Sequence, residues 1–450
     1  MRILHYFLGF PPYRTGGLTK FAYDLMMQQK IDGNEVMALW PGQITIIKTK
    51  TAIKRRNDVS GISNYELVNP LPVPLDEGIA APDYYMQATD ASVYKAFLQE
   101  CKPDVIHIHT MMGLHEEFFT AARECKVRVV YTTHDYFGIC NKVYLYRKCE
   151  SCDVNCKINN CAACNQSGLS YKKIVLMQSP IYRRLKNTYI VRMLRKRHRA
   201  VYFDEKDIDC DITVKDEKIL KSYEALRAFY KRLFGYIDCF HFTSTVSGDV
   251  YKSFMNNIEG QVISITHKGI SDMRQKKESY SDLLRLTCLA PAKPYKGFHI
   301  IRRALDELWD EGKRDFVLNI YSPVSNPAPY MIVHENGYSY DELDEILSNT
   351  DIVLATSVWH ETFGYTVLES VSRGVPVIVS DCMGAKDVIA DGGIVVHSGD
   401  VNDLKQAVLS LDRELLDRLN QNILAHVSIK EWRQFTDEIY DFYSTAVGNN

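Results

Sequence analysis

The sequence predicts an α/β protein built from two doubly wound domains that face each other across a cleft. Strand-like apolar runs alternate with helix-like runs through most of the 450 residues, and this alternation is typical of a parallel sheet covered by helices on both faces. A charged, serine-containing stretch that begins at Ser271 interrupts the alternation, which restarts after it. The length also exceeds the roughly 100 to 200 residues of a single domain.

The first half begins with a strand, a glycine-containing loop and a helix. Residues 2–7 are strand-like, residues 11–17 form a turn-rich loop, and the apolar residues that follow recur at the spacing of one helix face. Further helices are expected from about residue 113 and after residue 244. Further strands of this half are expected at residues 36–39, 104–110, 127–135, 238–244 and 262–270.

The second half repeats the pattern. Its expected strands are residues 283–291, 316–323, 351–357 and 375–381, and its expected helices are residues 297–312, 339–350 and 365–374. We therefore expect an amino-terminal domain at residues 1–272, a carboxy-terminal domain at residues 273–430 and a last helix, residues 431–450, that packs back on the amino-terminal domain. The first domain also contains a cysteine-rich insert at residues 140–168 and a basic helical segment at residues 181–200.

The composition is that of an ordinary globular protein. The formal net charge of −2 and the charged content of 24% give the chain no overall attraction to polyanions, so a basic partner site must be local. The first apolar run is short and is broken by Pro11 and Pro12, and no stretch approaches 18 uncharged apolar residues. We therefore expect a cytoplasmic protein.

Polar and glycine residues follow several expected strands, at the edge where a doubly wound sheet binds its ligand. Gly16 and Gly17 follow the first strand and open a helix, where backbone N–H groups can approach an anion. A plain tight turn is the alternative for this pair. His109 and His134 follow two later strands, and we expect both to contact a ligand in the cleft, although a single histidine at such a place is more often structural.

Lysines and glutamates occupy the same edge in the second half. Lys293 and Lys296 follow a strand and precede a helix, where their charge would stabilise a diphosphate as a bond to it breaks. Glu361 lies in a loop and Glu369 lies inside the next helix, while residues 362–364 can expose N–H groups at the start of that helix. Two carboxylates would then bracket one nucleotide sugar. The alternative is a capping glutamate and an ion-paired helix glutamate.

At these residues the chain resembles the family 4 glycosyltransferases, retaining enzymes with the two-Rossmann glycosyltransferase-B architecture. The resemblance covers nearly the whole chain and is strongest at the E-x7-E pattern from Glu361 to Glu369, which continues into Gly-Val-Pro-Val at residues 374–377. The chain departs from the family at residues 290–291, where Ala-Pro replaces the usual Gly-Arg. Lys293 is therefore expected to supply the missing charge.

The resemblance implies transfer of a sugar from a nucleotide-diphosphate sugar to a saccharide or lipid-linked acceptor, with retention at the anomeric carbon, in the synthesis of a cell-surface polysaccharide or glycolipid. The departing diphosphate would accept the proton of the acceptor hydroxyl. No cofactor or metal is expected in catalysis, because lysine charge and helix ends replace a cation. The implied catalytic residues are Glu361, His134, Lys293 and Lys296, and the implied donor-binding residues are Gly16, Gly17, His109, Thr362, Phe363, Gly364, Tyr365 and Glu369.

The cysteine-rich insert carries two C-x2-C pairs. Such pairs are typical of a structural zinc site, with four thiolates holding a loop that has no core of its own. Disulfides or free thiols are the alternatives. The predicted zinc ligands are Cys149, Cys152, Cys161 and Cys164.

The basic helical segment predicts contact with an anionic membrane surface. From Arg183 to Arg199 the chain has eight lysines and arginines and no acidic residue, and apolar residues are interleaved among them. This would place the protein peripherally at the inner face of the cell membrane. The alternative is a solvated helix paired with the acidic stretch that begins at Asp204.

Two other functions are compatible with parts of the sequence. A nucleotide-sugar epimerase or hydrolase on the same fold would consume the donor without an acceptor. A zinc-bearing nucleic-acid-binding protein would use the cysteine pairs and the basic segment, and its binding would weaken steeply with salt. That function leaves the histidines and both glutamates without a role, so we expect no nucleic-acid partner.

Overall fold

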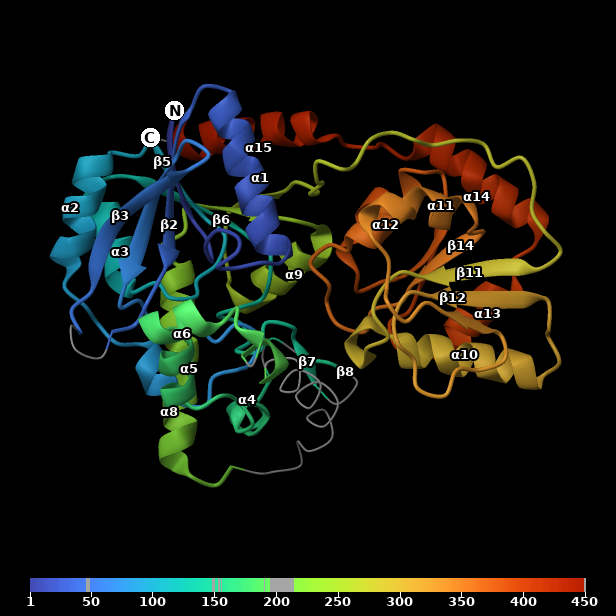
Figure 1. The fold of residues 1–450 in the computed structure, drawn as a ribbon, viewed down its shortest axis with the longest axis horizontal. Helices are drawn as coiled ribbons and strands as arrows, with labels where there is room; N and C mark the ends of the chain where they lie inside the picture. The colour runs from blue at the N-terminus through green and yellow to red at the C-terminus, as the bar shows by residue number, and fades with distance from the viewer. Residues whose placement is uncertain are drawn as a thin grey trace.

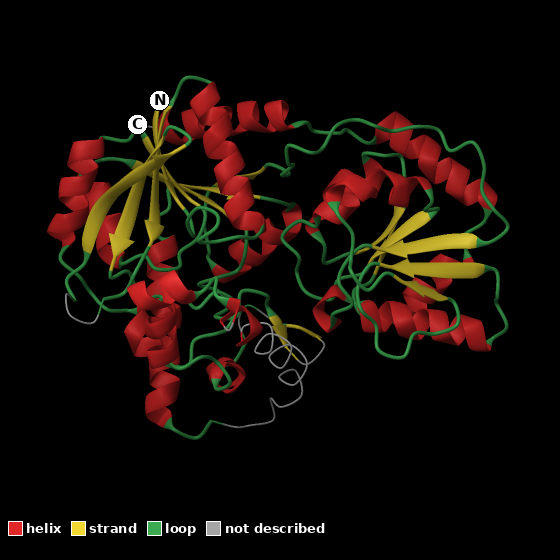
Figure 2. Cartoon of the chain, in the orientation of Figure 1, coloured by secondary structure: helices red, strands yellow, loops and turns green. Residues whose placement is uncertain are grey.

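The computed structural model describes residues 1–45, 49–147, 150–152, 154, 156–189, 191–194 and 214–448. These residues form two α/β domains, each with a largely parallel sheet between helices (Figures 1 and 2). The predicted fold class is therefore confirmed.

The amino-terminal sheet has the strand order β10-β9-β6-β5-β1-β2-β4-β3. Its neighbouring strands are parallel except for the β3–β4 pair, which is antiparallel. Central strands such as β1 are buried along most of their length, because helices cover both faces of the sheet. The strands are β1 (Arg2–Tyr6), β2 (Glu35–Pro41), β3 (Ala52–Val59), β4 (Ile62–Val68), β5 (Val105–Ile108), β6 (Arg128–Thr132), β9 (Cys239–Phe242) and β10 (Gly260–Val262).

Helices cover this sheet and also form a lower lobe around the cysteine-rich insert (Figure 1). A short strand pair, β7 (Tyr146–Arg147) and β8 (Glu150–Ser151), lies in the insert. The helices of the domain are α1 (Gly17–Ile31), η1 (Pro82–Tyr85), α2 (Ala91–Cys101), α3 (Glu116–Glu124), α4 (Ile158–Asn165), α5 (Tyr171–Met177), α6 (Pro180–Leu185), α8 (Glu217–Phe234) and α9 (Thr245–Phe254).

The carboxy-terminal sheet is parallel throughout, with the order β13-β12-β11-β14-β15-β16. Its strands are β11 (Leu284–Cys288), β12 (Phe316–Ile320), β13 (Met331–Val333), β14 (Ile352–Ala355), β15 (Val377–Ser380) and β16 (Gly393–Val396). Its helical elements are η2 (Pro294–Lys296), α10 (Phe298–Asp310), η3 (Tyr340–Glu342), α11 (Leu343–Ser348), α12 (Tyr365–Val371), η4 (Gly384–Val388), α13 (Val401–Leu409) and α14 (Arg413–His426). α10 buries Ile301, Leu305 and Leu308, which share one helix face.

Two segments differ from the predicted elements. Residues 262–270 were expected to form a strand, but β10 ends at Val262. Ile263 and Ile265 are instead buried in a core that also contains residues of the last helix and of the carboxy-terminal domain. The β3–β4 hairpin was not predicted, because β3 is an edge strand with a mostly exposed and charged sequence.

The last helix, α15 (Trp432–Gly448), lies beside α1 of the amino-terminal domain (Figure 1). Tyr440 donates a hydrogen bond to Asp32 at 2.9 Å, and Phe435 packs edge-on against Phe21 with ring centres 5.4 Å apart. The chain therefore crosses between the domains twice, before β11 and again after α14 (Figure 1). No helix in the described part of the chain is long and apolar enough to cross a membrane.

Candidate active site

Glu361 follows β14 and its carboxylate is held by two side chains of the same domain. Lys296 Nζ lies 2.5 Å from one carboxylate oxygen, and Ser357 Oγ donates to the other at 2.5 Å. The main chain is fixed as well, because Glu361 N donates to Cys382 O at 3.0 Å and Gly384 N donates to Glu361 O at 2.9 Å. Lys296 and Glu361, both predicted as site residues, thus form an ion pair in the structure.

Lys296 reaches Glu361 because the turn beneath it is very close to the neighbouring strand. Gly297 has φ +76°, and a Cβ at this position would lie 1.7 Å from Thr356 O, so only glycine fits. Lys293 caps η2 three residues before Lys296, and its main-chain N–H donates to Pro291 O at 2.7 Å. The role of Lys293 as a second cation stays a prediction.

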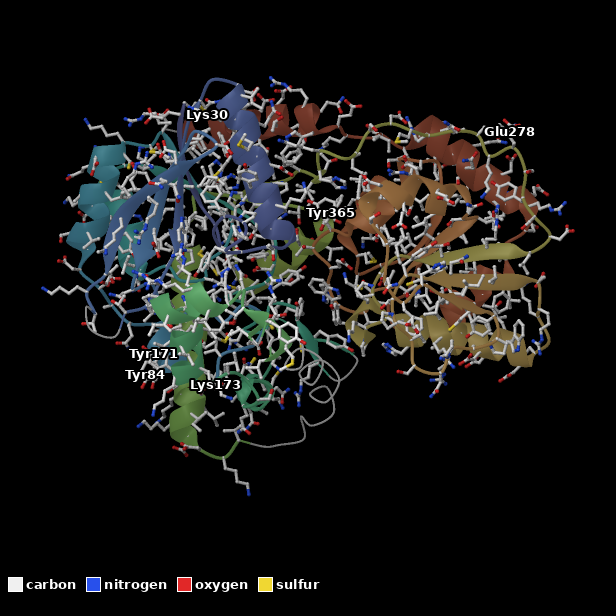
Figure 3. All side chains as sticks on the ribbon, in the orientation of Figure 1. Lys30, Tyr84, Tyr171, Lys173, Glu278 and Tyr365 are labelled. Carbon is white, nitrogen blue, oxygen red and sulfur yellow. The ribbon has the colours of Figure 1, made fainter. Side chains whose placement is uncertain are left out.

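Glu369 lies in the second turn of α12 and is nearly buried. Its carboxylate oxygen lies 3.3 Å from Nε2 of His267, a residue that follows β10 in the other domain. Tyr365, labelled in Figure 3 where the two domains face each other, packs edge-on against His267 at 5.1 Å between ring centres. Burial raises the pKa of Tyr365, so its hydroxyl stays neutral.

Thr362 joins the two halves of the site. Its hydroxyl donates to His134 O at 3.1 Å, and its own carbonyl accepts hydrogen bonds from Thr243 Oγ1 at 2.9 Å and Ser244 Oγ at 2.7 Å. Phe363 is buried in the core, and Gly364 takes φ +113° where a Cβ would meet the Met383 side chain at 2.6 Å. Whether the amides at the start of α12 bind the donor stays a prediction.

Gly16 ends the exposed loop after β1 and caps α1, and Gly17 is the first residue of that helix. Gly16 has φ +132°, and no atom lies within 4 Å of a Cβ built at either glycine, so the space beside this backbone is open. Lys186 of the basic segment fixes the same loop, because its Nζ donates to Tyr13 O at 2.8 Å and to Pro12 O at 3.1 Å. The open backbone suits the predicted anion contact.

His134 is half-buried and lies at the end of β6. Its Nε2 is 3.0 Å from Nδ1 of His109, and burial lowers the pKa of His134 to about 3. The prediction that His109 contacts a ligand is wrong. Its side chain is 0% exposed, and its two ring nitrogens are occupied by His134 and by His5 at 3.0 Å. His109 therefore positions His134 through the hydrogen bond between their rings.

Sequence reasoning missed two polar residues and an aromatic wall. Ser357 lies at the end of an expected strand, the same signal that identified His134, whereas His267 was expected inside the strand at residues 262–270; in the structure they bind the two glutamates. The wall crosses between the domains, with Tyr144 stacked on Tyr295 at 5.4 Å and edge-on to Trp359 at 5.3 Å. Lys296 Nζ lies 5.5 Å from the Trp359 ring centre, so the wall borders the Glu361 ion pair.

The described part of the cysteine-rich insert does not gather the predicted zinc ligands. Cys149 lies outside the described residues, and the sulfur atoms of Cys152, Cys161 and Cys164 do not all lie within 4.8 Å of one another. Cys161 Sγ is instead 3.0 Å from Cys156 Sγ and accepts a hydrogen bond from Arg227 at 3.2 Å. The four-cysteine zinc site stays a prediction.

The arrangement of two parallel-sheet domains defines the class of the protein as the glycosyltransferase-B fold. HepE from Anabaena, solved in complex with UDP, aligns with a TM-score of 0.54 and 13% identity over 99% of this chain and 100% of that one. Sucrose-phosphate synthase from Thermosynechococcus elongatus aligns with a TM-score of 0.53 and 11% identity over 100% and 99% of the two chains.

Within this class, residues 284–414 match the family described as glycosyl transferases group 1, and the resemblance to family 4 glycosyltransferases is confirmed. O-antigen chain mannosyltransferase RfbU of Salmonella typhimurium is 23% identical over 205 residues, which are 42% of this chain and 55% of the relative. A D-inositol 3-phosphate glycosyltransferase of Stackebrandtia nassauensis is 30% identical over 110 residues, which are 24% of this chain and 25% of the relative. The chain thus spans about half the length of the mannosyltransferase and about a quarter of the length of the inositol-phosphate enzyme.

Proposed function

We propose that the protein transfers a sugar from a nucleotide-diphosphate sugar to a saccharide or lipid-linked acceptor, with retention of configuration, in the synthesis of a surface polysaccharide or glycolipid. One observation carries the proposal: Glu361, paired with Lys296, is adjacent in the chain to Thr362, whose hydroxyl binds the main chain of His134. The loop that carries the carboxylate and its lysine is thereby joined to the strand end that carries His134 in the opposite domain.

Each group has a task in such a transfer. Glu361 can orient the hydroxyls of the donor sugar, and Lys296 can stabilise the negative charge that grows on the diphosphate as the bond from the anomeric carbon to its oxygen breaks. The acceptor oxygen forms the new bond to the same carbon, and its proton passes to the departing diphosphate. Glu369 is expected to hold the ribose. HepE, which shares the fold, was solved with UDP, and this supports a nucleotide-bound donor.

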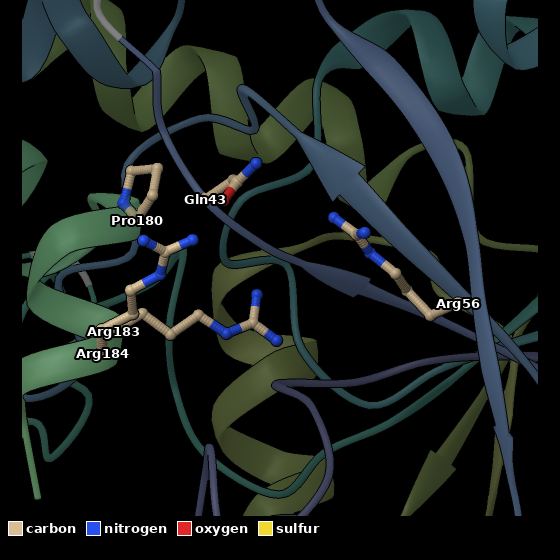
Figure 4. A pocket seen from close by; sticks show the side chains of 5 residues that line it. All are labelled: Gln43, Arg56, Pro180, Arg183 and Arg184. Carbon is tan, nitrogen blue, oxygen red and sulfur yellow. The ribbon is translucent and has the colours of Figure 1, made fainter.

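The acceptor side of the proposal rests on a pocket lined by arginines. A cavity of about 330 Å³ is bordered by Gln43, Arg56, Pro180, Arg183 and Arg184 (Figure 4). The fully buried Glu66 fixes two of these arginines, at 2.6 Å from Arg56 Nε and 2.9 Å from Arg183. Three guanidinium groups border the pocket and Glu66 pairs with two of them, so the pocket suits an anionic group such as the phosphate of a lipid-linked acceptor.

Apolar side chains on the same lobe support peripheral contact with an anionic membrane at the inner face of the cell. Ile181 and Leu176 are 69% and 60% exposed, and Lys173, labelled with Tyr171 in Figure 3, lies on the same helix as Leu176. Exposed apolar residues beside lysines and arginines are typical of helices that lie in a membrane interface. Residues 190 and 195–200 of the predicted basic segment lie outside the described residues.

The test is a thermal-unfolding screen against nucleoside diphosphates and their sugar conjugates, followed by donor turnover with and without acceptors. A ligand that binds only the folded protein raises the unfolding temperature. We expect stabilisation by one such conjugate and turnover that depends on an acceptor. Acceptor-independent turnover would favour the epimerase or hydrolase, and no stabilisation by any nucleotide would contradict the donor site.

A further inference from the structure

Five histidines lie on neighbouring strands of the amino-terminal sheet, and the proposed function uses only the one at the cleft. His5, His107 and His241 lie in β1, β5 and β9, and His109 and His134 follow β5 and β6. All except His134 are 0% exposed. A buried imidazole needs a partner for each ring nitrogen, so the protein must supply donors and acceptors in matched order.

The order is set at one end by a backbone carbonyl. Ile263 O can only accept, so His241 Nε2 donates to it at 2.7 Å and His241 Nδ1 must accept. The Thr132 hydroxyl therefore donates to His241 Nδ1 at 2.9 Å, which leaves Thr132 to accept from His107 Nε2 at 2.6 Å. His107 Nδ1 must then accept, and it does so from the Tyr443 hydroxyl at 2.6 Å.

The same logic continues to the cleft. Because the single proton of Tyr443 is used, its oxygen accepts from Gln29 Nε2 at 3.1 Å, and Gln29 Oε1 accepts from His5 Nε2 at 2.7 Å. His5 Nδ1 then accepts from His109 Nε2 at 3.0 Å, and His109 Nδ1 accepts from His134 Nε2 at 3.0 Å. The direction of every hydrogen bond follows from the one carbonyl.

We infer that this chain of hydrogen bonds holds His134 as the Nε2–H tautomer, with the lone pair of Nδ1 turned to the cleft as an acceptor for a sugar hydroxyl. Nδ1 of His134 makes no hydrogen bond to any described residue. Tyr443 of α15 and Gln29 of α1 are then positioning residues, since they act on the substrate only through the histidines. The substrate contact rests on the proposed function, whereas the tautomer does not.

The same series of hydrogen bonds also accounts for a cluster of histidines that resembles a metal site. His5, His107 and His109 bring ring nitrogens within 4.8 Å of one another. All six of their ring nitrogens, however, have hydrogen-bond partners in the chain described above. A metal would have to displace several of these bonds at once, so the geometry favours hydrogen bonding over metal binding.

The test is nitrogen-15 NMR of the histidine side chains in the unliganded protein, for the wild type, Tyr443→Phe and Tyr440→Phe. Tyr443→Phe removes the donor to His107 and the acceptor of Gln29, so the Gln29 amide can flip and the direction of the hydrogen bonds from Gln29 to His134 is no longer fixed. Tyr440→Phe is the matched control, because this hydroxyl lies on the same helix but binds Asp32 and Asn34 instead. We expect an unprotonated Nδ1 at His134 in the wild type and in Tyr440→Phe, and a mixture of tautomers in Tyr443→Phe.

Donor kinetics supply the second readout. With an active transferase, Tyr443→Phe should lower kcat/KM about 10-fold and Tyr440→Phe less than 2-fold, because only the former releases the His134 tautomer. A protonated Nδ1 in the wild type would overturn the inference even if Tyr443→Phe failed to fold. Identical His134 spectra in the two variants would also overturn it. Loss of activity in the wild type with the expected spectrum would contradict the proposed function alone.

Discussion

The two sides of the candidate site, which we call the amino-terminal wall and the carboxy-terminal wall after the domains that form them, carry different kinds of polar groups. The amino-terminal wall ends in buried imidazoles that hydrogen bond to one another, and burial lowers the pKa of His5 to about 4 and that of His134 to about 3. The carboxy-terminal wall carries an ion pair, Lys296 with Glu361, that is still partly exposed. One wall is neutral and geometrically fixed, and the other is charged.

The difference follows from where each wall meets water. An unpaired charge inside the sheet would lose its hydration. The histidine nitrogens of the amino-terminal wall are therefore hydrogen bonded to neutral donors and acceptors. The loop that carries Glu361 is largely buried, but the Lys296 and Glu361 side chains are still 18% and 12% exposed, so this ion pair keeps part of its hydration. Charge is therefore available where a diphosphate is proposed to bind, and a fixed hydrogen-bond acceptor, Nδ1 of His134, is available where the sugar is proposed to bind.

Acid should lower the stability of the folded protein through the buried histidines of the amino-terminal wall, and this is the largest effect we expect. The unfolded chain binds a proton on each histidine below pH 6.5, whereas folded His5 and His241 do so only near pH 4. The unfolded state thus binds more protons between these values, and stability falls as the pH drops through this window by about 1.4 kcal/mol per pH unit for each such histidine. Asp135, with a pKa raised to about 6, opposes this trend as a single group.

Thermal unfolding between pH 7.5 and pH 4.5 measures the effect. His241→Gln should flatten the pH dependence by about one proton, even if the variant is less stable overall. His397→Gln is the matched control, because His397 is exposed and Asp403 raises its pKa. An equally steep profile for His241→Gln and the wild type would show that the buried imidazoles do not decide acid stability.

Replacing Glu361 tests the charged wall. Glu361→Ala leaves Lys296 and Ser357 without their carboxylate partner and removes the proposed sugar contact, so transfer should fall on the order of 100-fold or more. Glu361→Gln keeps one acceptor oxygen and should fall less. Released nucleoside diphosphate measures the rate, and Glu414→Ala, at an exposed position of α14, serves as the control. Unchanged transfer by a folded Glu361→Ala would remove Glu361 from the mechanism.

The sequence predicted the charged wall better than the neutral one, and the reason is local. Glu361 and Lys296 lie in loops that directly follow strands, and the ends of parallel strands converge at one edge, so proximity follows from the strand pattern. The environment of His107 depends on Tyr443, 336 residues further along the chain. The spacing of nearby residues does not reveal packing of that kind, so the sequence did not show that His109 is buried among other histidines.

Two segments of the amino-terminal domain also show that the local sequence pattern does not always predict the secondary structure. The β3 strand is charged and exposed, as an edge strand must be to avoid pairing with other chains, so its sequence reads as a loop. Residues 263–270 are apolar enough for a strand, yet Ile263 and Ile265 pack against elements of both domains instead. In both segments tertiary context overrides the local pattern.

A smaller effect is expected at the arginine-lined pocket of the neutral wall's domain. Arg184→Gln removes the exposed guanidinium while leaving Glu66 paired with Arg56 and Arg183. The KM for a phosphate-bearing acceptor should rise about 10-fold, and the KM for the donor should not change, because the charge is lost only on the acceptor side. Arg303→Gln, on an exposed face of α10, controls for the overall charge. A rise in the donor KM alone would contradict the assignment.

The seam between the walls provides the smallest and most specific test. Thr245 at the start of α9 donates both its N–H and its hydroxyl to Asp387 in η4, each at 2.6 Å, so the two domains are joined beside the Thr362 contacts. Thr245→Val removes one of these bonds, which is worth about 1 kcal/mol at an exposed position, and should raise the donor KM about 5-fold with little change in kcat. Thr120→Val, whose hydroxyl binds Glu117 O within α3, removes a comparable bond away from the seam. If both variants raise the donor KM equally, the walls do not depend on this seam for their alignment, and the neutral and charged groups must be brought together by the ligand itself.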